Sequence, residues 1–336
     1  MLLSSLVAAL LLQAPPPAVA AQKTGCRFGL VAELPVTFEN NRPTVTVEVD
    51  GKPLRALLDT GADTSVIFGA AATRLGLKVR ELGGVEVYGA DGRTKAYVAH
   101  IDHLALMGHT GPPFDIAVNL SAGASGEDML LGRDLLLATD LELDLGHAKV
   151  RLVRANACAD DEMAYWSDRY SEARMVDGMK DEVRLQVRMN GAYVIAMLDS
   201  GAQRSVASDR VAFSAGVALA EPDPHDRITG VAGKLVQMRQ GVVKHMTVGD
   251  EALNNVPFSF GPMTLQPAFT HGRMEIVAPV EMLLGADFLK AHRVLIAKET
   301  GKVYFTYNGG PIFRTTPADA KPLSASTPAE SPIAKP

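Results

Sequence analysis

The stretch Leu57-Leu58-Asp59-Thr60-Gly61-Ala62-Asp63-Thr64-Ser65-Val66 decides the fold, because the chain carries a second copy of it. The second copy reads Met197-Leu198-Asp199-Ser200-Gly201-Ala202-Gln203-Arg204-Ser205-Val206, and six of its ten residues are identical to those of the first. In each copy an acid follows an apolar, strand-like run, and a small hydroxyl residue and a glycine come directly after it. Two carboxylates at equivalent places in a repeat are positioned to meet across a pseudo-two-fold axis.

Three further landmarks accompany each acid in the same order. A strand–turn–strand pattern precedes it, with Asp50-Gly51 or Asn190-Gly191 at the turn, and such dipeptides are strong hairpin signals. A glycine-rich turn follows roughly 30 residues after each acid. An apolar run closed by glycine comes last, as Met129-Leu130-Leu131-Gly132 and Met282-Leu283-Leu284-Gly285. Together these landmarks predict an internal duplication.

Short runs rich in Val, Ile and Leu alternate with polar residues and are interrupted by Gly, Asp and Asn, which is typical of strands. We expect few helices. One is predicted at Ala70–Leu75 and one at Asp209–Ser214, each ending shortly before a glycine, and others directly after Gly132 and Gly285. The pattern therefore predicts a mainly β protein with short helices.

The paired motifs resemble the aspartic peptidases, specifically the retroviral-like (retropepsin) type, over roughly residues 43–155 and 180–308. The resemblance implies two β-barrel lobes related by a pseudo-two-fold axis, each with a flap hairpin and a short helix after its apolar-apolar-Gly motif. Retropepsins assemble their site from two identical chains, whereas this chain supplies both halves, so a monomer is sufficient. Asp59 and Asp199 are then the catalytic acids, no cofactor is expected, and the substrate is a peptide or protein in extended conformation.

The resemblance also gives roles to the neighbours of the two acids. The hydroxyls of Thr60 and Ser200 would bond across to the opposite lobe and hold the carboxyls coplanar. Gly61 and Gly201 would allow a tight turn and a close approach of backbone N–H groups to the carboxylates.

The glycine-rich turns are predicted to be the tips of two flaps. In the first copy the turn contains Tyr88, Gly89 and Gly92, and in the second it contains Gly230 and Gly233. Tyr88 resembles the flap tyrosine of pepsin-like enzymes, and the alternative is a strand tyrosine that faces the core or solvent.

One difference between the copies predicts a contact. The first copy has Asp63 four residues after its acid and Arg133 directly after Gly132, whereas the second has Gln203 and Ala286 at those places. Both members of a potential ion pair are present in one copy and absent from the other, as expected if they touch, because losing one partner leaves a buried charge unpaired. We interpret Asp63 and Arg133 as a structural pair at the edge of the substrate cleft.

The segments outside the repeats give a domain organisation. Residues 1–21 are apolar and end in small residues, which predicts a signal peptide cleaved after Ala20 or Ala21, with an uncleaved anchor as the alternative. The predicted lobes are residues 27–155 and 181–313, joined by a polar linker at 156–180 and followed by a disordered Pro/Ala-rich tail at 314–336. No stable membrane span is expected after signal cleavage.

Export bears on the two cysteines of the chain. In a periplasmic or extracellular protein Cys26 and Cys158 are candidates for a disulfide that ties off the first lobe, and two unpaired thiols are the alternative.

Composition argues against other classes of function. The formal net charge is −5 and no dense Lys/Arg block occurs, so nucleic-acid binding is not supported. His100 and His103 have a spacing that suits a metal, but no second cluster supports them, and we expect no metal site. No serine elbow and no phosphate-binding glycine loop is present in the sequence.

We therefore expect an exported, single-chain aspartic endopeptidase that hydrolyses peptide bonds with a water activated between two aspartates. Two alternatives stay open. One is a catalytically inactive peptide- or protein-binding module with the same fold. The other is a protease that acts mainly on itself.

Overall fold

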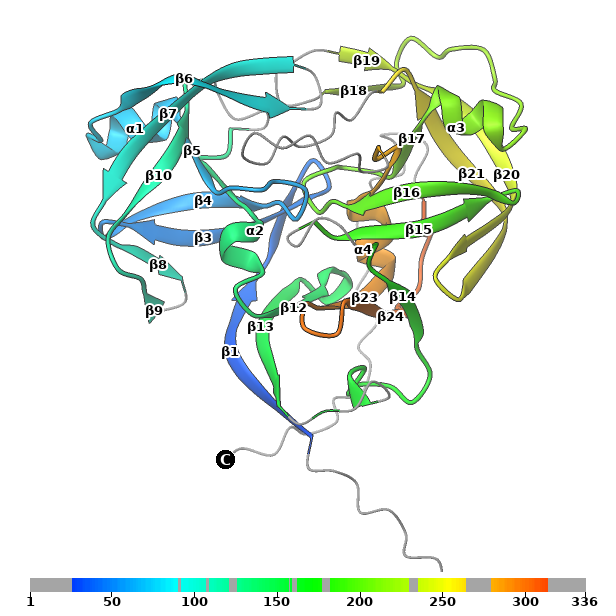
Figure 1. Cartoon of the computed structure of the whole chain (residues 1–336), viewed down its shortest axis with the longest axis horizontal. Helices are drawn as coiled ribbons and strands as arrows, with labels where there is room; N and C mark the ends of the chain where they lie inside the picture. Colours follow the sequence, from blue (N-terminus) through cyan, green and yellow to red (C-terminus); the bar gives the residue numbers. More distant parts are fainter. Residues whose placement is uncertain are drawn as a thin grey trace, which may run out of the picture.

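The computed structural model describes residues 26–89, 92–106, 109–120, 126–156, 158, 162–176, 182–229, 235–263 and 279–313. Within these residues strands dominate, and they form two lobes that stand side by side above a shared sheet (Figure 1). Each lobe contains one copy of the repeat. The predicted β-rich, two-lobed architecture is confirmed.

The first lobe is one ten-stranded sheet, in which the strand order is β6-β7-β10-β5-β11-β4-β3-β8-β9 and β2 pairs with β3. Its strands are β2 (Thr37–Glu39), β3 (Arg42–Val49), β4 (Lys52–Leu58), β5 (Val66–Phe68), β6 (Arg80–Gly89), β7 (Gly92–Ile101), β8 (Leu104–Leu106), β9 (His109–Thr110), β10 (Phe114–Asn119) and β11 (Met129–Leu131). Two short helices belong to it, α1 (Gly69–Leu75) and α2 (Arg133–Leu136).

The second lobe is a closed barrel of six strands in the order β15-β16-β22-β17-β21-β20, with a separate β18-β19 ribbon. Its strands are β15 (Arg184–Met189), β16 (Ala192–Leu198), β17 (Val206–Ser208), β18 (Arg227–Thr229), β19 (Leu235–Gln237), β20 (Arg239–Val248), β21 (Glu251–Gly261) and β22 (Met282–Leu284). Its helices are α3 (Asp209–Ser214) and α4 (Ala286–Ala291). As predicted, α2 and α4 begin directly after Gly132 and Gly285.

The chain runs through equivalent strands in the same order in the two lobes, although the resulting sheets differ. In the second lobe β20 is continuous and pairs with both β21 and β15, which closes the barrel. In the first lobe the equivalent path is divided into β7, which pairs with β10, and β8, which pairs with β3. The same backbone hydrogen bond marks this point in both lobes, from Asp50 N to His103 O (3.0 Å) and from Asn190 N to His245 O (2.8 Å).

The hairpin turns and the strand alternation explain why these segments pair. Asp50-Gly51 has φ values of 51° and 75°, and Asn190-Gly191 has 49° and 90°. Positive φ at both central residues matches the right-handed twist of the flanking strands, and Asp, Asn and Gly tolerate it best. Along β3 the apolar Val45, Val47 and Val49 are buried while Glu48 is exposed, so one face of the hairpin packs into the core.

A six-stranded sheet with the order β1-β13-β12-β23-β24-β14 lies beneath both lobes. It consists of β1 (Arg27–Pro35), β12 (Asp140–Asp144), β13 (Lys149–Asn156), β14 (Ser171–Arg174), β23 (His292–Ala297) and β24 (Lys302–Tyr307), and a 3-10 turn, η1 (Leu145–His147), joins β12 to β13. At its centre β12 from the first half pairs antiparallel with β23 from the second, with Glu142 opposite Leu295. Backbone hydrogen bonds therefore join the two halves.

The described part of the connector between the lobes contacts the shared sheet. It contributes β14 to the edge of that sheet. Met163 and Ala164 are buried against that sheet, and the Trp166 indole N–H donates to the Thr306 hydroxyl (2.9 Å). The apolar residues dispersed among the acids of this segment give it a packed side. The described part of the connector therefore packs on the shared sheet.

Candidate active site

Each repeat acid lies at the end of a strand in a fixed position. The Asp59 N–H donates to the Leu131 carbonyl (3.0 Å), and the Asp199 N–H donates to the Leu284 carbonyl (2.9 Å). The acids therefore follow β4 and β16, while the apolar-apolar-Gly motifs provide the adjacent parallel strands β11 and β22. This is the local reason that the two motifs recur together in each copy.

Thr60 and Ser200 connect the two lobes reciprocally. The Thr60 hydroxyl donates to the Leu198 carbonyl (2.7 Å) and accepts from the Ser200 N–H (3.0 Å). The Ser200 hydroxyl donates to the Leu58 carbonyl (2.7 Å) and accepts from the Thr60 N–H (3.0 Å). Both side chains are fully buried, so these four bonds form away from water and fix the two acid-bearing loops against each other.

The glycines place each loop directly over the acid of the other lobe. A Cβ atom built on Gly61 would lie 2.6 Å from Cγ of Asp199, and one built on Gly201 would lie 2.5 Å from Cγ of Asp59. No real Cβ tolerates such distances, so any larger residue at either position would push the lobes apart. The two carboxyls consequently meet at the lobe boundary, where each influences the pKa of the other.

The environment of the two acids favours a shared proton. Each Oδ1 accepts two backbone N–H bonds, from Gly61 (2.9 Å) and Ala62 (3.1 Å) at Asp59, and from the equivalent residues at Asp199. Desolvation raises the pKa of both carboxyls above the usual 3.8, and the negative charge of Asp59 helps to raise the pKa of Asp199 to about 8. Two carboxyls this close do not ionise together at low cost, so the pair holds one proton near neutral pH.

A serine–aspartate bracket supports each acid loop, and the sequence reasoning missed it. The Ser65 hydroxyl donates to Asp134 (2.7 Å) and accepts from the Gly132 N–H (3.0 Å), which ties the acid loop to the start of α2. The second lobe repeats the bracket with Ser205, Asp287 and Gly285. The signal was present, because both the serine and the aspartate recur at equivalent positions in the two copies.

Arg133 and Asp63 are in contact. One guanidinium nitrogen of Arg133, Nη2, donates to the Asp63 carboxylate. The other, Nη1, donates to the carbonyl oxygens of Thr60 and Gly61, each at 3.1 Å. The Arg133 side chain is only 1% exposed while that of Asp63 is 63% exposed, so the arginine lies behind the acid loop and the aspartate faces outward.

The second lobe has a different ion pair, which the sequence did not reveal. Arg204 donates to the Asp226 carboxylate, and Gln240 donates to the other oxygen of the same carboxylate. Both charged side chains are buried, at 9% and 4% exposure. Asp226 directly precedes β18, so this pair connects the acid loop to the base of the second glycine-rich arm.

The predicted flap residues are described only in part. Backbone pairing of Tyr88 with Arg93 and of Gly89 with Gly92 makes β6 and β7 one hairpin. The side chain of Tyr88 is outside what the structure describes, and so are Gly230 and Gly233. The strands β18 and β19 on either side of the second turn pair with each other, with Ile228 opposite Val236.

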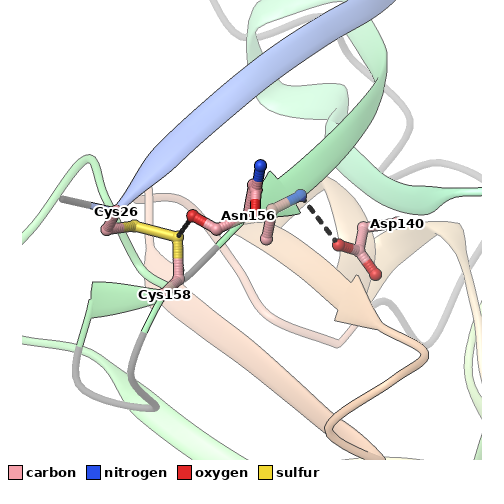
Figure 2. The surroundings of a disulfide bond; sticks show 5 residues. Cys26, Asp140, Asn156 and Cys158 are labelled. Atoms are coloured by element: carbon pink, nitrogen blue, oxygen red, sulfur yellow. Dashed lines mark hydrogen bonds between the residues drawn. A yellow bond between two sulfur atoms is a disulfide. The ribbon is translucent and has the colours of Figure 1, made fainter. Parts of the chain in front are cut away.

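Cys26 and Cys158 form a disulfide that closes the first half of the chain (Figure 2). It joins the beginning of β1 to the segment after β13, and Asp140 lies nearby, bonded to the Ala155 N–H (3.4 Å). Among the described residues no group of three or more His, Cys, Asp and Glu could hold a metal ion, and His100 is bonded to Asp115 (3.0 Å). In the same residues no helix is long and apolar enough to span a membrane.

Comparison with known proteins defines the class. The family model described as aspartyl protease matches residues 45–135 and 185–288, once in each lobe, and the chain belongs to this family. A segment of 120 residues is 32% identical to the Pol polyproteins of equine infectious anemia virus, strain Wyoming and isolate 1369. The match spans 35% of this chain and 10% of each polyprotein. The predicted retropepsin-like identity, duplicated within one chain, is confirmed.

Proposed function

We propose that the protein is an exported, single-chain aspartic endopeptidase that uses Asp59 and Asp199 as its catalytic pair. The observation that carries this proposal is the packing of each acid loop on the carboxyl of the other lobe: an ideal Cβ on Gly61 would lie 2.6 Å from Cγ of Asp199, and one on Gly201 would lie 2.5 Å from Cγ of Asp59. Both acids keep part of their surface exposed, so a water molecule and a peptide carbonyl have access to them. The substrate would be a peptide in extended conformation.

The chemistry follows from one proton shared by two carboxyls. The ionised carboxylate takes a proton from the water, whose oxygen attacks the peptide carbonyl, while the protonated acid donates its proton to the carbonyl oxygen. The resulting gem-diol then collapses: one hydroxyl returns its proton to one carboxylate, the other carboxyl protonates the leaving nitrogen, and the C–N bond breaks. The pair ends with one proton, as it began.

Export is supported by the disulfide and by the apolar leader. Disulfides persist in oxidising compartments, so a bond between Cys26 and Cys158 favours the periplasm or the extracellular space. The predicted signal peptide at residues 1–21 lies outside the described residues. The intact mass of the protein recovered from the exported fraction of expressing cells tests this part, and a mass that retains residues 1–21 in the cytosolic fraction would contradict it.

The decisive test of catalysis replaces each acid by its amide. Asp59→Asn and Asp199→Asn should each lower kcat/KM on a peptide library by about 10³-fold or more, because one carboxyl alone performs only half of the proton transfers. Cleavage is followed by mass spectrometry, and thermal unfolding verifies that each variant is folded.

The matched control is Asp102→Asn, which makes the same chemical change at a side chain that is 78% exposed. Its turnover should equal that of the wild type. Full activity in either dyad variant would exclude the shared-acid mechanism. A folded wild type that binds peptides without cleaving any of them would favour the binding module, and cleavage confined to its own chain would favour the self-processing enzyme.

A further inference from the structure

The two acids accept nearly identical hydrogen bonds, but the groups that bind the carbonyl oxygens of their loops differ. The N–H groups of Gly61 and Ala62 donate to Asp59 at 2.9 and 3.1 Å, and those of Gly201 and Ala202 donate to Asp199 at 2.9 and 3.0 Å. The direct contacts therefore do not distinguish the acids. The distinction lies on the carbonyl side of the same peptide groups.

In the first lobe a buried guanidinium binds those carbonyls. Arg133 Nη1 donates to the oxygens of Thr60 and Gly61, each at 3.1 Å. These oxygens belong to the two peptide groups whose N–H bonds point at Asp59. Hydrogen bonds in a chain polarise one another, so the cation strengthens both N–H donors as well as acting through its own charge. In agreement, Arg133 lowers the pKa of Asp59 against the effect of burial.

The second lobe has a methyl group where the first has the guanidinium. Ala286 follows Gly285 as Arg133 follows Gly132, and the arginine of the second acid loop, Arg204, is bonded to Asp226. The carboxylates of Asp134 and Asp287 occupy equivalent positions in the two brackets and so do not break the symmetry.

Two acids face Arg133, and both approach a different nitrogen from the one that is bonded to the acid loop. The Asp63 carboxylate and the Glu182 carboxylate (3.9 Å) both approach Nη2, whereas Nη1 is directed at the acid loop. Asp63 is 63% exposed and is screened by water, and Glu182 is paired with Arg184. Arg133 therefore binds the acid loop through Nη1 and its counter-charges through Nη2.

We infer that Arg133 is a positioning residue that fixes the negative charge of the free enzyme on Asp59 and leaves the proton on Asp199. The inference rests on the proposed peptidase function for its role in turnover. Asp59 then takes the proton from the water, and Asp199 gives its proton to the carbonyl oxygen. When the gem-diol collapses, Asp59 protonates the leaving nitrogen and Asp199 recovers a proton from a hydroxyl, which restores the starting state.

The test titrates each acid alone and needs no turnover. Protein labelled with ¹³C at the aspartate carboxyls is prepared as Asp199→Asn, which retains Asp59, and as Asp59→Asn, which retains Asp199. NMR titration should show Asp59 ionising at least about one pH unit below Asp199, the size of effect that a nearby opposite charge produces. Adding Arg133→Met to each of these variants should abolish the difference between the two titration midpoints, which we call the gap. Adding Arg133→Lys, which keeps the charge, should retain part of the gap.

The control is Arg210→Gln, which removes the same charge from a side chain that is 68% exposed and should leave the gap unchanged. If Arg133→Met does not fold, Asp63→Asn replaces it, because loss of the counter-charge should widen the gap. Equal midpoints in the two single variants, or a gap that survives Arg133→Met or does not widen in Asp63→Asn, would overturn the inference.

Turnover separates this inference from the proposed function. In an active peptidase Arg133→Met should move the acidic limb of the kcat/KM profile to higher pH, because Asp59 must be ionised to act as base. If no substrate is cleaved but the gap closes, the peptidase proposal fails and the charge assignment stands. If substrates are cleaved but the titration midpoints of the two acids coincide, the peptidase proposal stands and the charge assignment fails.

Discussion

The two lobes share their contacts at the pseudo-two-fold axis and the bracket behind each acid loop, but they differ in the ion pair that each loop makes. Thr60 and Ser200 make equivalent hydrogen bonds across the pseudo-two-fold axis, and both lobes have the serine–aspartate bracket. The ion pairs differ: the first lobe uses Arg133 with the exposed Asp63, and the second uses Arg204 with Asp226, both buried. The contacts across the axis and the serine–aspartate bracket are therefore alike in the two lobes, while the ion pairs differ.

The difference also changes what each acid loop is connected to. In the first lobe Arg133 reaches from the start of α2 to the acid loop itself. In the second Arg204 reaches from the acid loop to Asp226 at the base of β18, and Gln240 of β20 holds the same carboxylate. The second lobe thus couples its acid loop to the glycine-rich arm through a buried charge.

The largest difference between the lobes is expected from breaking these pairs. Arg204→Met should destabilise the protein by about 3–5 kcal/mol, because it leaves the buried Asp226 without its counter-charge. Asp63→Asn should cost less, about 1 kcal/mol, because its amide oxygen still accepts from the buried Arg133 and the Glu182 carboxylate lies 3.9 Å from the same guanidinium. Urea unfolding of the two variants measures both values, and equal costs would contradict the contrast.

The disulfide provides the next contrast, because only the first half of the chain is closed covalently. The bond joins residues separated by 132 positions. Replacing both cysteines by serine should lower the free energy of unfolding by about 2–5 kcal/mol, because the unfolded chain regains the freedom of a long loop. Chemical denaturation with and without a reductant measures the loss. The serine variant should be insensitive to the reductant, and a wild type equally insensitive to it would refute this role.

The dyad predicts a fall in stability with rising pH. Asp199 keeps its proton up to a pKa of about 8 in the folded protein but releases it near 3.8 when unfolded. Between these values the folded state binds more protons, so the free energy of unfolding decreases as the pH rises. Asp199→Asn mimics the protonated acid and should melt at a higher temperature than the wild type at pH 8, with the gap vanishing below about pH 4.

Thermal melts from pH 3 to pH 9 test this expectation, with Asp102→Asn as the control that should follow the wild type. A variant that melts below the wild type at pH 8 would contradict the raised pKa of Asp199.

The smallest expected effect concerns the equivalent helices α1 and α3. The Ser208 hydroxyl accepts from the Val211 N–H (3.3 Å) at the start of α3, whereas Phe68 precedes α1 and provides no side-chain cap. Ser208→Ala should cost about 1 kcal/mol. Equilibrium unfolding measures it, with Ser214→Ala at the other end of the helix as the comparison. A neutral Ser208→Ala would show that the second lobe does not depend on this cap.

The sequence predicted the parts of the fold that are encoded locally and repeated. Asp50-Gly51 and Asn190-Gly191 specify hairpins by their positive φ values, and Gly132 and Gly285 mark the start of α2 and α4. The pairing of Asp63 with Arg133 was suggested because both are replaced together in the second copy. Repetition thus supplied information about contacts that one copy alone would lack.

What the sequence did not reveal depends on tertiary packing. Arg204 and Asp226 have no counterparts in the first copy, and a charged residue gives no sign of its partner until the strands bring them together. The same is true of Glu142, which is fully buried and accepts from Arg293 (2.9 Å) and from Tyr165 of the connector. Short polar segments with dispersed apolar residues, such as the connector, are read correctly only when the surface that they cover is known.

The pairing of β12 with β23 has a consequence for how this protein could evolve. Leu141, Glu142 and Leu143 are in register with Ile296, Leu295 and Val294, so peptide groups of β12 and β23 help to fasten the halves together. Main-chain bonds form with almost any residue except proline. A duplicated gene with such a seam is free to accumulate substitutions in one half at a time, which turns a symmetric ancestor into a protein with two different halves.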